Sequence, residues 1–156
     1  MSRVFVGLGS NEGDRHAQLS RAARALGGLA RTRLVQMAPI YETAPVGPPQ
    51  PDFLNTVVEL DTRLAPQELL RELKRLEQKL GRRPSMQRWG PRPVDLDVLL
   101  YDDLILQEPE LTIPHPRLHE RWFVLEPLAQ LAPELVHPVL KQPISALLEQ
   151  VAPARP

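Results

Sequence analysis

The sequence of 156 residues contains no cysteine. A disulfide framework and a thiolate metal site are therefore both excluded. No apolar run approaches the ~18 residues of a membrane-spanning helix, and the N-terminus lacks the basic-then-apolar pattern of a secretory signal. We therefore expect a soluble, cytoplasmic protein without a membrane partner.

The sequence also lacks an excess of charge of either sign, because Lys+Arg and Asp+Glu both number 19. A surface-wide attraction to nucleic acid or to an anionic membrane is not expected from a net charge of zero. The length suits one domain with a proper core. We expect a single domain over residues 1–156, acting as a monomer on small-molecule substrates, with no nucleic-acid partner.

Proline is abundant, at 18 residues, where a usual content of ~5% predicts about eight. The prolines are scattered between apolar segments, so they indicate stiff loops and not disorder. The loop expected over residues 42–52 alone holds four of them.

Hydrophobic periodicity predicts four strands and three helices. The strands are expected at residues 3–8, 29–41, 53–60 and 94–100, and the helices at 15–26, 66–80 and 121–130. The tail from residue 133 to 151 is typical of a closing hairpin or a short helix. The order strand–helix–strand–strand–helix–strand predicts an α+β fold, a ferredoxin-like α/β sandwich with a largely antiparallel sheet.

The most informative stretch is residues 82–100, a basic loop followed directly by a strand. Side chains alternate across a strand, so Asp95 and Asp97 point to the same face, with Cα atoms about 7 Å apart. Two carboxylates at that spacing can converge on a hard cation, and a two-metal site clamps the oxygens of a phosphoryl transfer. Arginines from the adjacent loop can bind phosphates by bidentate hydrogen bonds. The loop arginines are Arg82, Arg83, Arg88 and Arg92.

Each half of this pattern also has an ordinary explanation. Exposed strand faces often carry an Asp-x-Asp pair, and arginine-rich loops are usually just solvated. The two together, with Trp89 in the loop and no spacer before Asp95, favour a polyphosphate site.

Two other features have a functional and a structural interpretation. Gly7 and Gly9 lead into a polar turn that resembles a phosphate cradle, but the turn lacks a full nucleotide fingerprint, and helix capping by Asp14 explains it better. His115 and His119 have the helical spacing of a metal pair, yet Pro116 lies between them. A surface histidine or a phosphate hydrogen-bond donor is the simpler interpretation.

Residues 88–97 read Arg-Trp-Gly-Pro-Arg-Pro-Val-Asp-Leu-Asp. This motif closely resembles the signature of the 6-hydroxymethyl-7,8-dihydropterin pyrophosphokinases of folate synthesis. The resemblance spans nearly the whole chain. Supporting matches are Gly9-Ser10-Asn11, Tyr41-x-Thr43-x-Pro45, Asp52-Phe53-Leu54-Asn55, Thr112-x-Pro114-His115 and Arg121-x-Phe123.

The resemblance implies transfer of a pyrophosphoryl group from ATP to a pterin hydroxymethyl group, with release of AMP and the use of two Mg²⁺ ions. It implies that Asp95 and Asp97 hold the metals and that Arg82 and Arg92 act on the phosphates. The implied pterin contacts are Thr43, Pro45, Val46, Phe53, Asn55, Trp89 and Phe123. The implied ATP contacts are Glu77, Arg83, Arg88, Thr112, His115 and Arg121.

One departure from the family lies in the basic loop, where Pro84 replaces a second loop arginine. Arg83, one residue earlier, is the candidate substitute. Two rival functions remain at this point. A metal-dependent phosphohydrolase would use the same aspartates, and an RNA-binding module would use exposed aromatics on a similar sheet.

Overall fold

The computed structural model describes residues 1–45, 47–81 and 93–151. Its main sheet has the order β2-β4-β1-β5, with β3 pairing with β4, and every pairing is antiparallel. A second, two-stranded sheet pairs β6 with β7. The strands are β1 (Ser2–Ser10), β2 (Thr32–Met37), β3 (Tyr41–Thr43), β4 (Phe53–Thr62), β5 (Asp95–Tyr101), β6 (Leu106–Gln107) and β7 (Thr112–Ile113).

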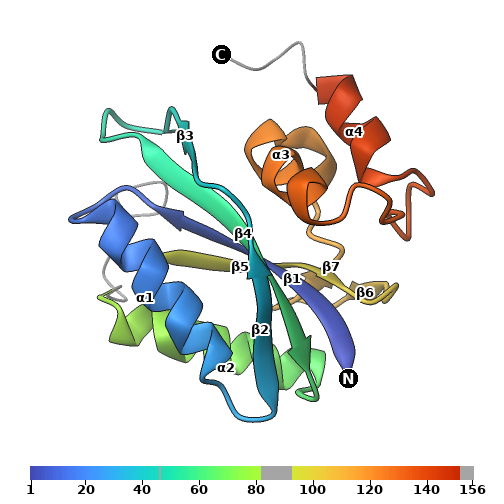
Figure 1. Cartoon of the computed structure of the whole chain (residues 1–156), viewed down its shortest axis with the longest axis horizontal. Coiled ribbons are helices and arrows are strands. Elements are labelled where there is room, and N and C mark those ends of the chain that lie inside the picture. Colours follow the sequence, from blue (N-terminus) through green and yellow to red (C-terminus); the bar gives the residue numbers. More distant parts are fainter. Residues whose placement is uncertain (46, 82–92, 152–156) are drawn as a thin grey trace.

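Helices cover both faces of the main sheet, which gives three layers (Figure 1). On one face α1 (Arg15–Gly27) and α2 (Pro66–Lys79) bury an aliphatic core that includes Leu26 and Leu69. On the other face α3 (Trp122–Leu131) and α4 (Ile144–Val151) bury a second core around Phe5 and Leu125, and a short 3₁₀ turn η1 (Leu118–Glu120) precedes α3.

Local sequence signals explain where the first two helices begin and end. The Asp14 carboxylate accepts from the backbone N–H of Ala17 and caps α1. Pro66 occupies the first turn of α2, where its missing N–H costs nothing. After α2, Gly81 has a φ of +114°, a conformation that side chains with a Cβ rarely adopt.

The predicted ferredoxin-like α+β fold is confirmed, but one predicted strand was wrong. The segment 29–41 is not continuous: β2 ends at Met37, and β3 starts at Tyr41 and runs on into the expected loop. Pro39 in the gap has no N–H for the ladder, and a register shift between Leu34 and Gln36 already bends β2. The tail, left open between a hairpin and a short helix, forms helix α4.

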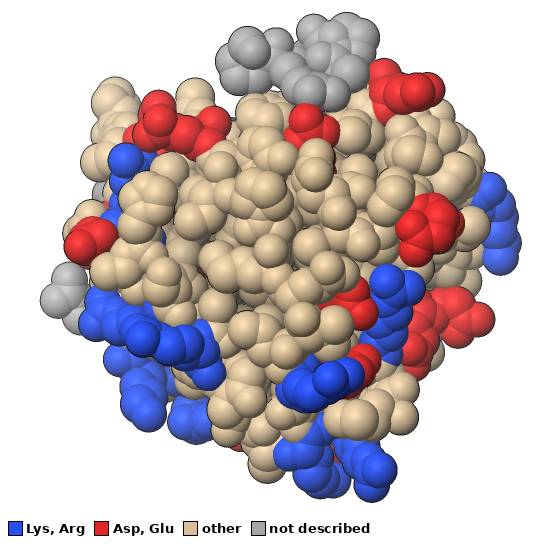
Figure 2. Space-filling model, viewed as in Figure 1, with Lys and Arg blue, Asp and Glu red and all other residues tan. Residues whose placement is uncertain are grey.

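On the face seen in Figure 2, basic side chains gather along the lower rim and acidic ones along the upper and right margins, so both signs are present there. Across the described ranges, no helix is long and apolar enough to span a bilayer.

The second face of the sheet is only partly covered, and this leaves room for a site. Val57 and Leu99 are buried beneath α3 and α4. Further along the same strands, Asn55, Asp95 and Asp97 are only partly buried. The sheet is therefore accessible at the ends of β4 and β5 that meet beside β1.

Candidate active site

Three adjacent strands place a candidate pterin contact and a candidate metal ligand in one cross-strand row. Gly9 of β1 is the cross-strand partner of both Asn55 in β4 and Asp95 in β5. Cross-strand partners point to the same face, and two strand spacings separate the Asn55 and Asp95 Cα atoms by about 10 Å. In the next row along that face, Gly7 pairs with Asp97.

The two glycines leave this part of the sheet without side chains on its central strand. A Cβ at Gly9 would lie 3.3 Å from the Asn55 Oδ1 atom and 3.6 Å from the Phe53 ring. Both side chains therefore lean over Gly9 from β4. Gly9 itself is buried, so the surface at this point is formed by the Asn55 amide and the Phe53 ring, with Asp95 on the other side of β1.

Thr43 and Asn55 form a fixed polar pair at this edge. The Asn55 Nδ2 atom donates to the Thr43 Oγ1 atom over 2.8 Å, and Thr43 is buried. With its amide nitrogen held in this way, the Asn55 Oδ1 acceptor faces Gly9, where it can receive an N–H from a heterocycle. Pro45 follows in the loop and is half-buried.

Phe123 belongs to a chain of aromatic side chains that links α3 to β3. The Trp122 ring lies edge-on to the Tyr41 ring at 6.5 Å and to the Phe123 ring at 6.3 Å. The Arg121 guanidinium lies 5.8 Å from the Phe123 ring centroid. Because Tyr41 pairs with Asn55 in the sheet, this chain brings the start of α3 to the same end of the sheet as Phe53.

Asp95 and Asp97 lie on one face of β5, as their spacing predicts, with buried Leu96 between them. Burial lowers the pKa of Arg121, and the Asp97 and Asp95 carboxylates act against that shift. Arg121 therefore stays cationic within electrostatic reach of both aspartates. Within the described ranges no three His, Asp or Glu side chains converge as a ready-made metal site. Mg²⁺ usually takes one or two carboxylates and completes its shell with water and phosphate, so the aspartate pair fits it.

Three further ATP candidates among the described residues are Glu77, His115 and Thr112. Glu77, buried at the end of α2, accepts from the Leu96 N–H at 2.8 Å, and the His115 N–H donates to the Leu99 carbonyl at 2.9 Å. Thr112 lies in the neighbouring β7. Glu77 thus lies beside the aspartates, and one of its oxygens has a structural role that sequence reasoning did not anticipate.

The environment of His115 fixes its protonation state. Burial, reinforced by the charges of Arg121 and Arg117, lowers its pKa from 6.5 to about 4. Its Nδ1 atom accepts from the Arg117 backbone N–H at 3.1 Å. The neutral imidazole therefore carries its proton on Nε2, as a hydrogen-bond donor.

A pH-dependent stability follows from this shift. The unfolded chain protonates His115 near pH 6.5, and the folded chain only near pH 4. Between these two values the unfolded state binds more protons than the folded state. The free energy of unfolding therefore falls as the pH drops through that window. We expect His115→Gln to lose less stability than the wild type between about pH 7 and about pH 5, measured by urea unfolding. His16→Gln, an exposed position on α1, is the control. An unchanged slope in His115→Gln would contradict the assignment.

Six predicted site residues lie outside the described residues: Val46, Arg82, Arg83, Arg88, Trp89 and Arg92. Among the described ones, sequence reasoning missed the place of Gly9 between Asn55 and Asp95, because the glycines were placed at a turn. The signal was present, since Gly7 and Gly9 are two residues apart and therefore share a strand face. Trp122 was also missed, because its contact with Tyr41 joins distant parts of the chain.

The fold and the site define a ferredoxin-like α+β protein that combines a pair of candidate metal-binding carboxylates with a neighbouring polar and aromatic surface. Residues 5–133 match the family described as 7,8-dihydro-6-hydroxymethylpterin-pyrophosphokinase (HPPK). The match covers most of the chain, which therefore belongs to this family, and the resemblance in the sequence motifs is confirmed.

Curated relatives agree with the family match. A 2-amino-4-hydroxy-6-hydroxymethyldihydropteridine pyrophosphokinase of Haemophilus influenzae is 42% identical over 153 residues, covering 97% of this chain and 94% of that protein. A protein of the same name from Pseudomonas aeruginosa is 46% identical over 136 residues, covering 86% and 83%. The chain is also 41% identical to the folic acid synthesis protein fol1 of Schizosaccharomyces pombe over 95% of its own length, but spans only 20% of that protein.

Solved structures share the fold. A Plasmodium falciparum HPPK-DHPS structure with pterin and p-hydroxybenzoate superposes with a TM-score of 0.77 at 16% identity, covering 98% of this chain and 43% of the other. A second HPPK-DHPS structure, in complex with substrates, gives a TM-score of 0.76 at 14% identity over 98% of this chain and 44% of the other. At these identities the likeness concerns the fold.

Proposed function

We propose that this protein transfers the pyrophosphoryl group of ATP to the hydroxymethyl group of 6-hydroxymethyl-7,8-dihydropterin, a step of folate biosynthesis. The products are the pterin diphosphate and AMP. The observation that carries this proposal is the row through Gly9, which has the amide of Asn55 on one side and the carboxylate of Asp95 on the other. A pyrophosphokinase of this family must bind its pterin next to the polyphosphate of ATP, and this row offers a contact for each.

The heterocycle belongs on the β4 side of the row. Asn55 Oδ1 accepts a ring N–H, while Thr43 holds the amide in place. Phe53 and Phe123 stack on the two faces of the ring, and Trp89 covers it. Pro45 and the backbone of Val46 complete the pterin contacts.

The nucleotide belongs on the β5 side. Asp95 and Asp97 hold two Mg²⁺ ions, which when bound neutralise phosphate charge and polarise the transferred group. Arg121 and the Nε2–H of His115 bind phosphate oxygens. Glu77, Thr112, Arg83 and Arg88 are the other nucleotide contacts.

The reaction itself is an in-line displacement at the β-phosphorus. The pterin hydroxyl oxygen forms a bond to that atom, the bond from it to the α–β bridging oxygen breaks, AMP leaves, and the hydroxyl proton passes to solvent. Catalysis of such a step depends on position and charge more than on a covalent intermediate. Arg82 and Arg92 supply positive charge to the phosphates.

The test is to incubate the protein with ATP, Mg²⁺ and the hydroxymethyl dihydropterin and to identify the products. We expect AMP and the pterin diphosphate in equal amounts. Release of ADP or phosphate without pterin would instead indicate a phosphohydrolase, and salt-dependent binding of single-stranded RNA would favour the RNA-binding alternative.

We also propose that the enzyme acts as a monomer in the cytoplasm. The support for this proposal is that one chain supplies Asn55, Asp95 and Arg121 at the same part of the sheet. Light scattering during size-exclusion chromatography, with and without substrates, tests the monomer.

Phe53 and Phe123 allow a prediction that distinguishes pterin binding from ATP binding. We expect Phe53→Ala and Phe123→Ala to weaken pterin binding and to leave ATP binding unchanged, because each removes a stacking contact worth about 0.5–1.5 kcal/mol beyond area burial. Isothermal titration of each ligand measures this. Unchanged pterin affinity in both variants would exclude the two-sided stacking arrangement.

A further inference from the structure

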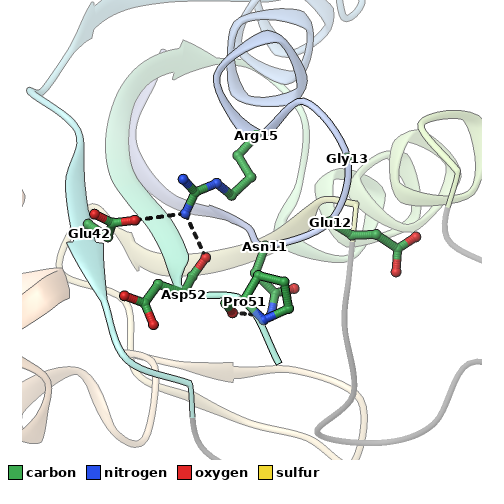
Figure 3. Close-up of a pocket in the computed structure, with 7 residues that line it drawn as sticks. All are labelled: Asn11, Glu12, Gly13, Arg15, Glu42, Pro51 and Asp52. Atoms are coloured by element: carbon green, nitrogen blue, oxygen red, sulfur yellow. Dashed lines mark hydrogen bonds and ion pairs between the residues drawn. The ribbon is translucent and has the colours of Figure 1, made fainter. Parts of the chain in front are cut away.

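The segment between β3 and β4 is held at both ends by a single arginine. Arg15 is the first residue of α1, and its Nη1 atom donates to the Glu42 Oε2 atom and to the Asp52 carbonyl oxygen, each over 2.9 Å. Figure 3 shows this nitrogen between the two acceptors. Glu42 lies where the chain is about to leave the sheet and Asp52 where it returns, so one guanidinium joins the two ends.

Asn11, in the turn before α1, also holds the end of the segment that leads into β4. The Asn11 Nδ2 atom donates to the Gln50 Oε1 atom at 2.7 Å and to the Pro51 carbonyl at 3.0 Å. Asn11 is buried, whereas the Arg15 side chain keeps 29% of its exposure. Asn11 and Arg15 together therefore contact three consecutive residues before β4, namely Gln50, Pro51 and Asp52.

These contacts lie on the α1 face of the sheet, opposite the candidate pterin surface, and involve the residues next to Thr43 and Phe53. Thr43 follows Glu42, Phe53 follows Asp52, and Thr43 and Phe53 are cross-strand partners. Strand alternation turns Glu42 toward α1 and Thr43 toward the opposite face. The Asp52 carbonyl belongs to the peptide group that carries the Phe53 nitrogen, so fixing this oxygen restrains the backbone from which the Phe53 ring projects.

We infer that Arg15 is a positioning residue for the pterin site: by joining Glu42 to the Asp52 carbonyl, it holds Thr43 and Phe53 in register. The inference rests on the proposed function, and Arg15 itself touches no substrate. Its two bonds need two N–H donors in a fixed plane, which a guanidinium provides and a lysine ammonium reproduces less well.

The experiment compares Arg15→Ala, Arg15→Lys and a matched control, Arg33→Ala. Arg33 also forms a surface ion pair across β4, with Asp61 at 2.6 Å, but at the far end of that strand. We expect Arg15→Ala to weaken pterin binding about 5–30-fold, because the lost free energy should lie between that of an exposed ion pair and that of a hydrogen bond to a charged group. Arg15→Lys should recover part of the loss, and Arg33→Ala should show none. ATP affinity should change less than about twofold in all three, as for a distant site.

Hydrogen exchange supplies a readout that does not depend on the reaction. In the free protein, amides of residues 43–54 should exchange faster in Arg15→Ala than in the wild type or Arg33→Ala, while those of α2 should not. Equal exchange in all variants would overturn the inference, and so would faster exchange with unchanged pterin affinity. If the wild type neither binds pterin nor makes the diphosphate, the proposed function and the pterin role of Arg15 both fail. Faster exchange in Arg15→Ala would in that case show only that Arg15 stabilises the segment between β3 and β4.

Discussion

Replacing Asp97 or Asp95 with alanine or asparagine abolishes turnover, with an expected loss of at least about 10³-fold, the upper end for removal of one electrostatic stabiliser. Both carboxylates lie on one face of β5, beside the two glycines of β1. Asparagine keeps the size of the side chain and removes its charge, so the loss isolates the charge that binds the metal. Product formation at saturating ATP and pterin, as a function of Mg²⁺ concentration, is the measurement.

The same variants should fold normally. Removing one carboxylate relieves repulsion from the other, but it also removes charge near Arg121. Because these effects oppose each other, we expect the free energy of unfolding to change by no more than about 1 kcal/mol. Asp61→Asn, on β4 away from the site, is the control. Near-normal activity of either variant at modest Mg²⁺ would show the metal assignment to be wrong.

Arg82→Ala and Arg92→Ala should each lower the single-turnover rate by about 10²–10³-fold. A cation that meets the phosphates chiefly as charge develops contributes to the transition state and little to ground-state binding. Pterin and ATP dissociation constants should therefore change far less than the rate. Rapid-quench measurement of one turnover, with equilibrium titration of each substrate, separates the two quantities.

Arg83 is the control for this pair. Pro84 stands where the family has a second loop arginine, so if Arg83 replaces it, Arg83→Ala will slow the reaction or weaken ATP binding. If Arg83 is only solvated, its variant will behave as wild type. A large loss of ATP affinity at an unchanged single-turnover rate in Arg82→Ala and Arg92→Ala would instead make those arginines ground-state clamps.

The sequence predicted those parts of the molecule that local patterns determine. Leu69, Leu73 and Leu76 of α2 repeat with helical spacing and are buried, and alternation along β5 placed Asp95 and Asp97 on one face. The helix cap at Asp14 and the first-turn proline at Pro66 were equally local signals. Each of these depends on residues a few positions apart, where the backbone period alone decides the outcome.

Features that depend on distant partners were not predictable in this way. Pro39 was a local signal for the break between β2 and β3, but where each strand ends depends on its pairing with β4, and Ala38 in the gap donates to the Val57 carbonyl. The place of Gly9 between Asn55 and Asp95 depends on how β4 and β5 pair with β1. A single sequence contains no register between strands, so such pairings appear only in the fold.

The contacts along β5 also bear on how the protein behaves at high concentration. Strand β5 ends the order of the main sheet, and a bare outer strand is a template for joining two molecules through their backbones. Here the Leu96 N–H is taken by Glu77 and the Leu99 carbonyl by the His115 N–H. The strand that presents the aspartates is thereby protected against edge-to-edge aggregation by two residues that flank the candidate nucleotide site.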